Sequence, residues 1–247
     1  MKVRFFTIPN LLTLSNLMCG TFAALAALVY DNLEWAFWFV ILAAVFDFFD
    51  GFAARLLRQS SPIGVQLDSL ADMISFGFVP AAVLYAMTTR TMGEEQTLLR
   101  YAYAVASFLL AAFSALRLAK FNIDDSQHEE FCGLPTPANA LFFTSLGLIS
   151  ARTGFDFGGE WLICIMPVMA WLLISPVRMF SLKFKGFGWR GNEIRYLFLA
   201  LCVALIAILQ LYSIPTIILL YILVSAVRWG LKHNGYGINN CLIGRVA

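Results

Sequence analysis

Four carboxylates and one arginine lie within 26 residues of a chain that is otherwise strongly apolar. The aspartates are Asp47, Asp50, Asp68 and Asp72, and Arg55 follows the first pair. The chain is 60 % hydrophobic and 13 % charged. An ionised group at membrane depth costs roughly 2.5–3.5 kcal/mol on insertion scales, so it is usually retained for function. All-oxygen ligation without a neighbouring His or Cys predicts a hard divalent cation, Mg²⁺ or Mn²⁺.

The spacing places the first pair on one helix face together with small residues. Successive helical residues rotate by about 100°, so Asp50, Gly51 and Ala54 fall within roughly 60° of Asp47. Arg55 flanks the same side and suits bidentate binding of phosphate. This face therefore combines metal ligands, room for a close approach, and a phosphate-binding cation.

A helix break separates the two aspartate pairs. We expect Ser61 to cap a new helix and Pro62 to be its first residue. Asp68 and Asp72, four residues apart, then project from one face of that helix. Two carboxylates about 4 Å apart repel by around 4 kcal/mol at an effective dielectric near 20, so four together require protonation or divalent cations. Metal-bound carboxylates beside an arginine indicate a site for a nucleotide or diphosphate leaving group.

Two alternatives stay open for this cluster. The carboxylates could line a water-filled cavity or pair with Arg55 and Arg58 as interhelical ties, although four acids against two bases leave a negative excess. A cation transporter also places carboxylates within the membrane. The cluster lies at one membrane face rather than at the midplane, and it includes an arginine. Both features favour an enzyme.

Apolar runs of about 20 residues, each long enough to cross a hydrocarbon core of about 30 Å, predict an all-α integral membrane protein with eight spans. The mean hydropathy is +0.78. Tyr212-Ser213-Ile214-Pro215 should reverse the chain between the last two spans. The expected spans are 11–30, 35–56, 63–88, 100–121, 136–152, 161–180, 195–212 and 214–231.

The basic residues predict the orientation of the chain in the membrane. With the N-terminus in the cytoplasm, the 17 basic residues divide 14 to 3, and only Arg90, Arg100 and Arg152 lie outside. Both termini and the aspartate cluster are then cytoplasmic, as expected for a multi-pass protein of the cell inner membrane. The basic inner face predicts contact with anionic membrane lipids or a phosphorylated substrate, and no nucleic acid partner is expected.

The pattern D-x2-D-G-x2-A-R-x8-G-x3-D-x3-D resembles the signature of the CDP-alcohol phosphatidyltransferases. Every fixed position matches, from Asp47 through Gly64 to Asp72. The resemblance implies that two divalent ions held by the aspartates bind the diphosphate of a CDP-activated lipid. The hydroxyl of an acceptor alcohol then attacks the lipid-side phosphorus and CMP leaves.

The resemblance also implies roles for single residues. Asp47, Asp50 and Asp68 would be metal ligands, and Asp72 both a ligand and the general base on the acceptor hydroxyl. The residues expected to bind the CDP-lipid are Asn16, Gly51, Ala54, Arg55 and Gly64. Gly64 would let the connecting loop turn, and Asn16 could instead tie two helices together. A homodimer is also common in the family.

The family core of six helices predicts a division of the chain into two parts. Residues 1–180 would form the core, and 181–247 a basic cytoplasmic loop, two extra C-terminal transmembrane helices and a short tail.

Three further strings resemble the integral-membrane phosphatidylserine synthases within this family. They are Pro9-Asn10-x2-Thr13-x2-Asn16-x2-Cys19-Gly20, Arg117-Leu-Ala-Lys120-Phe-Asn122 and Gly133-Leu-Pro135-Thr-Pro137. The expected reaction is then transfer from CDP-diacylglycerol to L-serine, with Arg117, Lys120 and Asn122 binding the acceptor. Those synthases often have arginine where this chain has Lys120. Glycerol 3-phosphate, inositol phosphate or choline as the acceptor stays an alternative.

Overall fold

The computed structural model describes residues 5–59, 61–90, 98–123, 131–155, 157, 159–179, 188 and 192–233, and helices dominate these ranges. Two strands of two residues each are the exception among them. The elements are α1 (Ile8–Leu28), α2 (Leu33–Leu56), α3 (Pro62–Asp72), η1 (Met73–Phe78), α4 (Val79–Arg90), α5 (Leu98–Ala106), α6 (Leu109–Ile123), β1 (Phe131–Cys132), α7 (Thr136–Thr153), α8 (Gly159–Ile174), β2 (Arg178–Met179), α9 (Glu193–Leu209), η2 (Gln210–Tyr212) and α10 (Ser213–His233).

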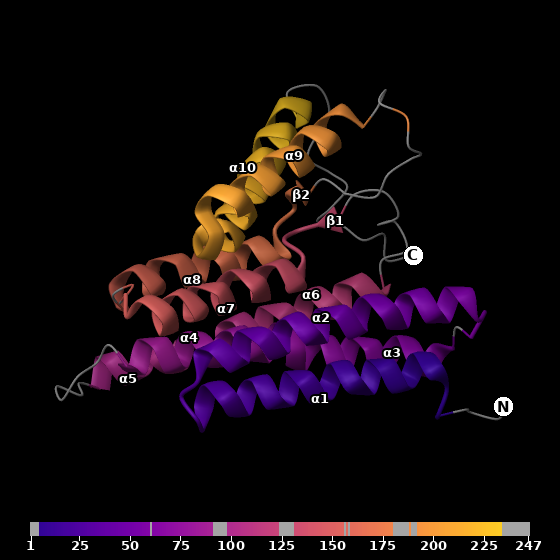
Figure 1. Cartoon of the computed structure of the whole chain (residues 1–247), viewed down its shortest axis with the longest axis horizontal. Helices are drawn as coiled ribbons and strands as arrows, with labels where there is room; N and C mark the ends of the chain where they lie inside the picture. Colours follow the sequence, from indigo (N-terminus) through magenta and orange to yellow (C-terminus); the bar gives the residue numbers. More distant parts are fainter. Residues whose placement is uncertain are drawn as a thin grey trace.

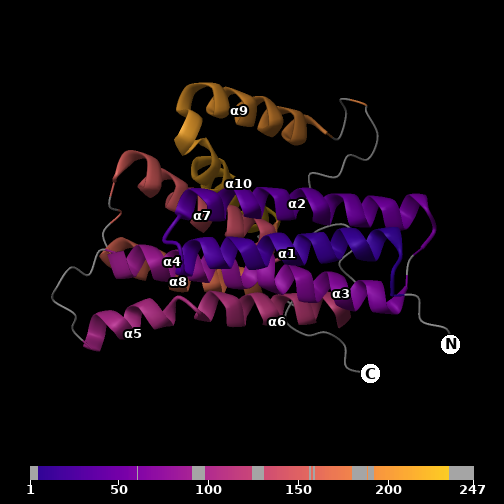
Figure 2. The same ribbon diagram turned by 60° about the horizontal axis from the view of Figure 1, so that its bottom comes forward.

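Helices α1 to α8 run roughly along one axis and form a bundle, with α9 and α10 at one side (Figure 1). Helix α7 is at the centre of this arrangement, because it contacts α2, α4, η1, α8 and α10. All its residues from 142 to 149 are buried. Turned by 60°, the bundle shows α1 lying between α2 and α3 (Figure 2). Three helices that are consecutive in sequence thus form one layer, which carries the aspartates.

Among the residues that the structure describes, five segments are long and apolar enough to cross a membrane, which confirms the all-α integral membrane class. They are Ile8–Leu28, Leu33–Leu56, Pro62–Arg90, Ala104–Ile123 and Glu193–Leu231. Helix α7 is not among them. Its polar residues, including Asn139, Thr144 and Ser145, are buried inside the bundle and lower its hydropathy.

The boundaries of several expected spans differ from the observed helices. The third span is continuous from Pro62 to Arg90 but contains the π-helical turn η1, directly after Asp72. The fourth is interrupted at residues 107–108, between α5 and α6. The sixth ends at Ile174, because the chain then turns into β2.

The two C-terminal helices form the expected hairpin. The reversal occurs at Gln210, whose φ of 43° is left-handed, and not at Tyr212–Pro215. Pro215 instead lies in the first turn of α10, where a missing backbone donor is tolerated. The rings of Phe198 and Tyr221 are 6.2 Å apart and join α9 to α10. In the apolar 18-residue stretch that qualifies Glu193–Leu231 as a span, only 11 % is buried, so most of that stretch presents its side chains outward.

The short β1–β2 pair connects the start of α7 to the end of α8. Phe131 pairs with Met179 and Cys132 with Arg178 in antiparallel register. The Gly133 N–H donates to the Val177 carbonyl at 2.9 Å. Gly133 has a φ of +77°, and a Cβ there would lie 2.3 Å from the Leu173 carbonyl oxygen. A glycine is therefore required for this close approach.

Ion pairs mark the end of the bundle opposite the aspartates. Arg90 of α4 pairs with Asp31 in the α1–α2 connection at 2.6 Å. Arg152 of α7 pairs with Glu34 of α2 at 2.5 Å. Two of the three basic residues expected outside the cytoplasm therefore lie at one end of the bundle, far along the helices from the aspartate cluster.

Candidate active site

Three of the four aspartates converge at one end of the bundle. Asp47, Asp50 and Asp68 each offer one carboxylate oxygen, and these oxygens all lie within 4.8 Å of one another. Asp47 and Asp50 come from the last turns of α2, and Asp68 comes from α3. Asp50 is buried, and the other two are half-buried. Such a set of hard oxygen donors fits a divalent cation.

The helix break that allows this convergence follows the predicted capping chemistry. Helix α2 ends near Arg58, whose φ of 52° turns the chain. The Ser61 hydroxyl then accepts a hydrogen bond from the Gly64 N–H at 3.1 Å, and Pro62 is the first residue of α3. The prediction of this cap is confirmed. The cap fixes where α3 begins and therefore the direction in which Asp68 projects from the helix.

Helix α1 supplies polar side chains that hold two of the aspartates. Thr13 is buried, and its hydroxyl donates to Asp50 Oδ2 at 2.6 Å. One turn further along, the Asn16 amide donates to Asp72 Oδ1 at 3.2 Å. The Asn16 bond therefore ties α1 to the end of α3 at the acidic cluster. Outer contacts of this kind orient carboxylate ligands.

An open cavity of about 170 Å³ lies beside the aspartates. Its walls come from α1, the end of α2, and the start of α3, and they include Asp50 and Asp68. The remaining lining residues are Pro9, Asn10, Thr13, Gly51, Ala54, Gln59, Ser61, Gly64 and Val65. A space of this size next to a carboxylate cluster suits the polar end of a nucleotide-bearing ligand.

Three residues expected to bind the CDP-lipid line this cavity, each for an identifiable reason. A Cβ added at Gly51 would meet nothing within 4 Å, so its missing side chain leaves open space, and Ala54 adds only a methyl group. Gly64 does not make the loop turn, because it lies inside α3; a Cβ there would be 3.2 Å from Asn10 Oδ1. Its smallness serves the close approach of α1 and α3. Arg55 is exposed, and its Nε donates to the Gly51 carbonyl at 3.0 Å.

Asp72 is not part of the three-oxygen group, although it lies within electrostatic reach of Asp47 and Asp68. Its neighbours differ in kind from those of the other three. Asn16 donates to it, and the Arg117 guanidinium attracts it. Asp72 therefore lies between the aspartate cluster and Arg117 of α6.

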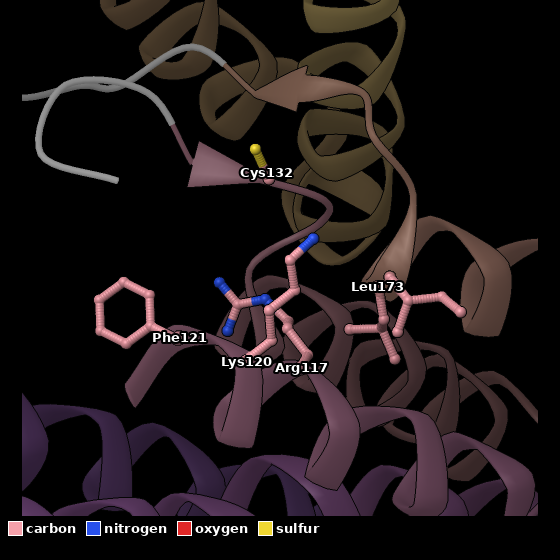
Figure 3. A pocket seen from close by; sticks show the side chains of 6 residues that line it. Arg117, Lys120, Phe121, Cys132 and Leu173 are labelled. Atoms are coloured by element: carbon pink, nitrogen blue, oxygen red, sulfur yellow. The ribbon is translucent and has the colours of Figure 1, made fainter. Parts of the chain in front are cut away.

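Arg117 and Lys120 extend from α6 toward β1 (Figure 3). They line a small cavity of about 10 Å³ together with Phe121, Cys132, Leu173 and Ile174. The Arg117 Nη1 donates to the Thr136 hydroxyl at 2.8 Å, which joins α6 to the start of α7. Asn122 does not line this cavity. It is exposed, and its Nδ2 donates to the Ser69 hydroxyl at 2.8 Å on the outer side of α3.

Three residues without a role predicted from the sequence also lie at the site. Thr13 contacts Asp50, Thr136 contacts Arg117, and Tyr221 of α10 interacts electrostatically with Arg117. Thr13 and Thr136 both lie inside the sequence strings that carry the family resemblance, and this location could have indicated a role at the site. For Tyr221 the sequence holds no signal, since it belongs to a separate helical hairpin.

The fold and the acidic site define an integral membrane protein with a candidate site for a divalent cation. The chain belongs to the CDP-alcohol phosphatidyltransferase family, whose model matches residues 6–177. Among similar proteins, one from Helicobacter pylori (strain ATCC 700392 / 26695) is 28 % identical over 228 residues, 91 % of each chain. One from Mycobacterium bovis is 29 % identical over 245 residues, 92 % of this chain and 81 % of its own.

A third relative, from Bacillus subtilis, is 36 % identical over 130 residues, 53 % of this chain and 69 % of its own. All three relatives are named CDP-diacylglycerol–serine O-phosphatidyltransferase. The chain is therefore similar, over nearly its whole length, to enzymes of phospholipid biosynthesis.

Proposed function

We propose that the protein transfers a phosphatidyl group from CDP-diacylglycerol to L-serine, giving phosphatidylserine and CMP. The observation that carries the proposal is the group of three carboxylates beside the 170 Å³ cavity, in a chain of this family. Serine as the acceptor is supported by the names of the relatives and by the Arg117 guanidinium, which approaches Asp72 from α6.

The donor set fits a divalent cation, either Mg²⁺ or Mn²⁺, and we propose that two such ions bind. Asp47, Asp50 and Asp68 would hold the first ion, and Asp72 would share the second. Metal bound there would neutralise charge that develops on the diphosphate as CMP departs. The three-oxygen group has a buried hydroxyl donor behind it, as expected for carboxylates held in place for ligation.

The other proposed roles are substrate binding and proton transfer. In the proposed arrangement Gly51, Ala54 and Gly64 leave room for the cytidine end, and Arg55 holds phosphate. Asn16 stays a proposed contact of the CDP-lipid, although it does not line this cavity and its amide donates to Asp72. Asp72 takes the proton from the serine hydroxyl. The serine oxygen then forms a bond to the lipid-side phosphorus, and the bond from that phosphorus to the CMP oxygen breaks.

The proposed serine site lies on the α6 side of Asp72. Arg117 is best placed to bind the serine carboxylate, because it is next to Asp72 and is held by Thr136. Lys120 would add positive charge from the same cavity. Asn122 stays a proposed acceptor contact, but it would have to exchange its bonds with Ser69 for the substrate.

The proposal extends to location and organisation. The protein would lie in the cell inner membrane with the aspartates and both termini in the cytoplasm, as the distribution of basic residues predicts. Residues 1–180 would form the catalytic core, and the remaining helices an addition to it. A homodimer belongs to the same proposal.

The reaction can be tested on purified protein in detergent. CDP-diacylglycerol and Mg²⁺ or Mn²⁺ are supplied with each candidate alcohol, and CMP release is followed. We expect serine-dependent CMP release that stops with a chelator and returns with either metal. CMP release with glycerol 3-phosphate but not with serine would refute serine as the acceptor. Folded protein that releases no CMP with any alcohol would refute the enzyme itself and favour a transporter.

The role of Asp72 can be tested in the same assay. Asp72→Asn keeps the shape and the bond from Asn16 but removes the proton acceptor. We expect turnover to fall by about 10²–10⁴-fold, the usual contribution of a general base, with CDP binding retained. Loss of CDP binding in this variant would make Asp72 chiefly a metal ligand.

A further inference from the structure

Within the described ranges, the buried side-chain polar atoms without a hydrogen-bond partner gather around one element. They are Oδ1 of Asn16, Oγ of Ser114, Nε of Arg117, and both amide atoms of Asn139. These residues belong to α1, α6 and α7, and all three helices pack against η1. Because η1 begins directly after Asp72, the helices that carry the unpartnered atoms all contact the continuation of the helix that carries the proposed base.

Two of these side chains have no role in the proposed function so far. Ser114 lies one turn before Arg117 on α6 and is fully buried. It faces η1, since a Cβ built on Gly77 would lie 3.1 Å from the Ser114 Cβ. Asn139 lies one turn after Thr136, the partner of Arg117, and is also fully buried. Ser114 and Asn139 thus continue the Arg117–Thr136 contact by one turn on each helix.

An amide with neither its donor nor its acceptor bonded is unfavourable in a protein interior. Replacing it with an apolar side chain of similar shape would remove that cost. A buried amide in this condition is therefore best explained by a polar group that binds to it. Asn139 lies one turn after Thr136, which binds Arg117, and it does not line the cavity between α1, α2 and α3, so its position points to the acceptor rather than the CDP-lipid.

We infer that Asn139 is a specificity-determining residue that, with Ser114 and Arg117, binds a zwitterionic acceptor alcohol. This inference rests on the proposed function. The amide presents a donor and an acceptor side by side, so Nδ2–H can donate to a carboxylate while Oδ1 accepts from an ammonium group. Arg117 Nε supplies a second donor to the carboxylate. A phosphate group in place of the ammonium group would bring hydrogen-bond acceptors against the Oδ1 atom, which is itself an acceptor.

The experiment compares Asn139→Leu with a matched control on the same helix. Thr144→Val is the control, because the Thr144 hydroxyl is buried but donates only to its own helix, to the Ala140 carbonyl at 2.7 Å. With saturating CDP-diacylglycerol and Mg²⁺, we expect Asn139→Leu to raise the KM for L-serine by about tenfold or more, the effect of losing hydrogen bonds to charged groups. CDP affinity, measured by titration, should stay within about twofold of wild type, and Thr144→Val should change neither value.

Two serine analogues test whether the amide reads both charged groups. Serinol lacks the carboxylate, and 3-hydroxypropionate lacks the ammonium group. For the wild type, the inhibition constant of each analogue should be higher than the KM for serine. In Asn139→Leu the difference between serine and each analogue should shrink, which a purely structural role for Asn139 would not produce.

An unchanged KM for serine in folded Asn139→Leu would overturn the inference and assign the amide to a buried water. If Asn139→Leu does not fold, Asn139→Ala and Ser114→Ala carry the same test, because alanine removes the polar atoms and introduces no branched side chain. An unchanged KM in both would again overturn the inference. Failure of the proposed function looks different, because the wild type itself would then release no CMP with serine.

Discussion

Removal of the Thr13 hydroxyl should weaken metal binding without unfolding the protein. The hydroxyl lies 2.6 Å from Asp50 Oδ2, a distance typical of a hydrogen bond to an ionised oxygen. Such a bond contributes about 1.5–3 kcal/mol, and contacts of this kind behind a metal ligand typically change metal affinity by about 10–100-fold. Thr13→Val removes the donor and nearly preserves the shape. We therefore expect the half-saturating metal concentration to rise by about 10–100-fold.

The assay is CMP release from CDP-diacylglycerol and serine across a titration of Mg²⁺ or Mn²⁺. Thr21→Val is the matched control, since the Thr21 hydroxyl on the same helix donates only to the Leu17 carbonyl at 2.9 Å. Thr13→Ser keeps the donor and should retain most of the metal affinity. The reasoning is refuted if Thr13→Val and Thr21→Val need the same metal concentration, because Thr13 would then not support a metal ligand.

Three further changes separate binding from stability. Gly51→Ala should leave the free energy of unfolding equal or up to about 1 kcal/mol higher, because alanine favours the helix and its Cβ would meet nothing within 4 Å. The same change should weaken CDP binding, measured by titration, and unchanged binding would place the nucleotide elsewhere. Gly20→Ala should destabilise the protein by roughly 1–3 kcal/mol in a melting experiment, because its Cβ would lie 2.8 Å from the Ser75 Cα; an unaltered melting temperature would contradict the close packing of α1 on η1. Arg117→Ala and Thr136→Val should each raise the KM for serine. In a double-mutant cycle their effects should be coupled by about 0.5–3 kcal/mol, because Thr136 binds Arg117. Additive effects would mean that Thr136 does not position Arg117.

The aspartate end of the molecule could be predicted from the sequence because short-range rules control it. Asp47 and Asp50 are one turn apart on α2, and the Ser61–Pro62 start fixes the rotation of Asp68 on α3. Helix periodicity and capping therefore determine most of this geometry. What periodicity could not provide is the neighbour across the helix interface: Thr13 reaches Asp50 only because α1 lies between α2 and α3.

The acceptor side was less predictable, because it depends on packing between segments that are distant in sequence. Arg117, Lys120 and Asn122 are close together on α6, yet rotation along the helix sends them to different neighbours. Arg117 meets Thr136 of α7, whereas Asn122 meets Ser69 of α3. A string of polar residues near a helix end specifies a cationic surface, but which of them enters the interior depends on where β1 and α7 return to the bundle.

Asp72 explains why one helix can serve both halves of the proposed reaction. It shares a face of α3 with Asp68, so counting along the helix assigns both to the metal site. Its neighbours argue for a different task, because Asn16 binds one of its oxygens and Arg117 approaches from the acceptor side. The π-helical turn begins at the next residue, and such turns often occur at functional sites. In the proposed reaction, a carboxylate that borders the metal ligands and faces the acceptor would act both as a ligand and as the base, so the acid–base step and the choice of alcohol would depend on the same residue.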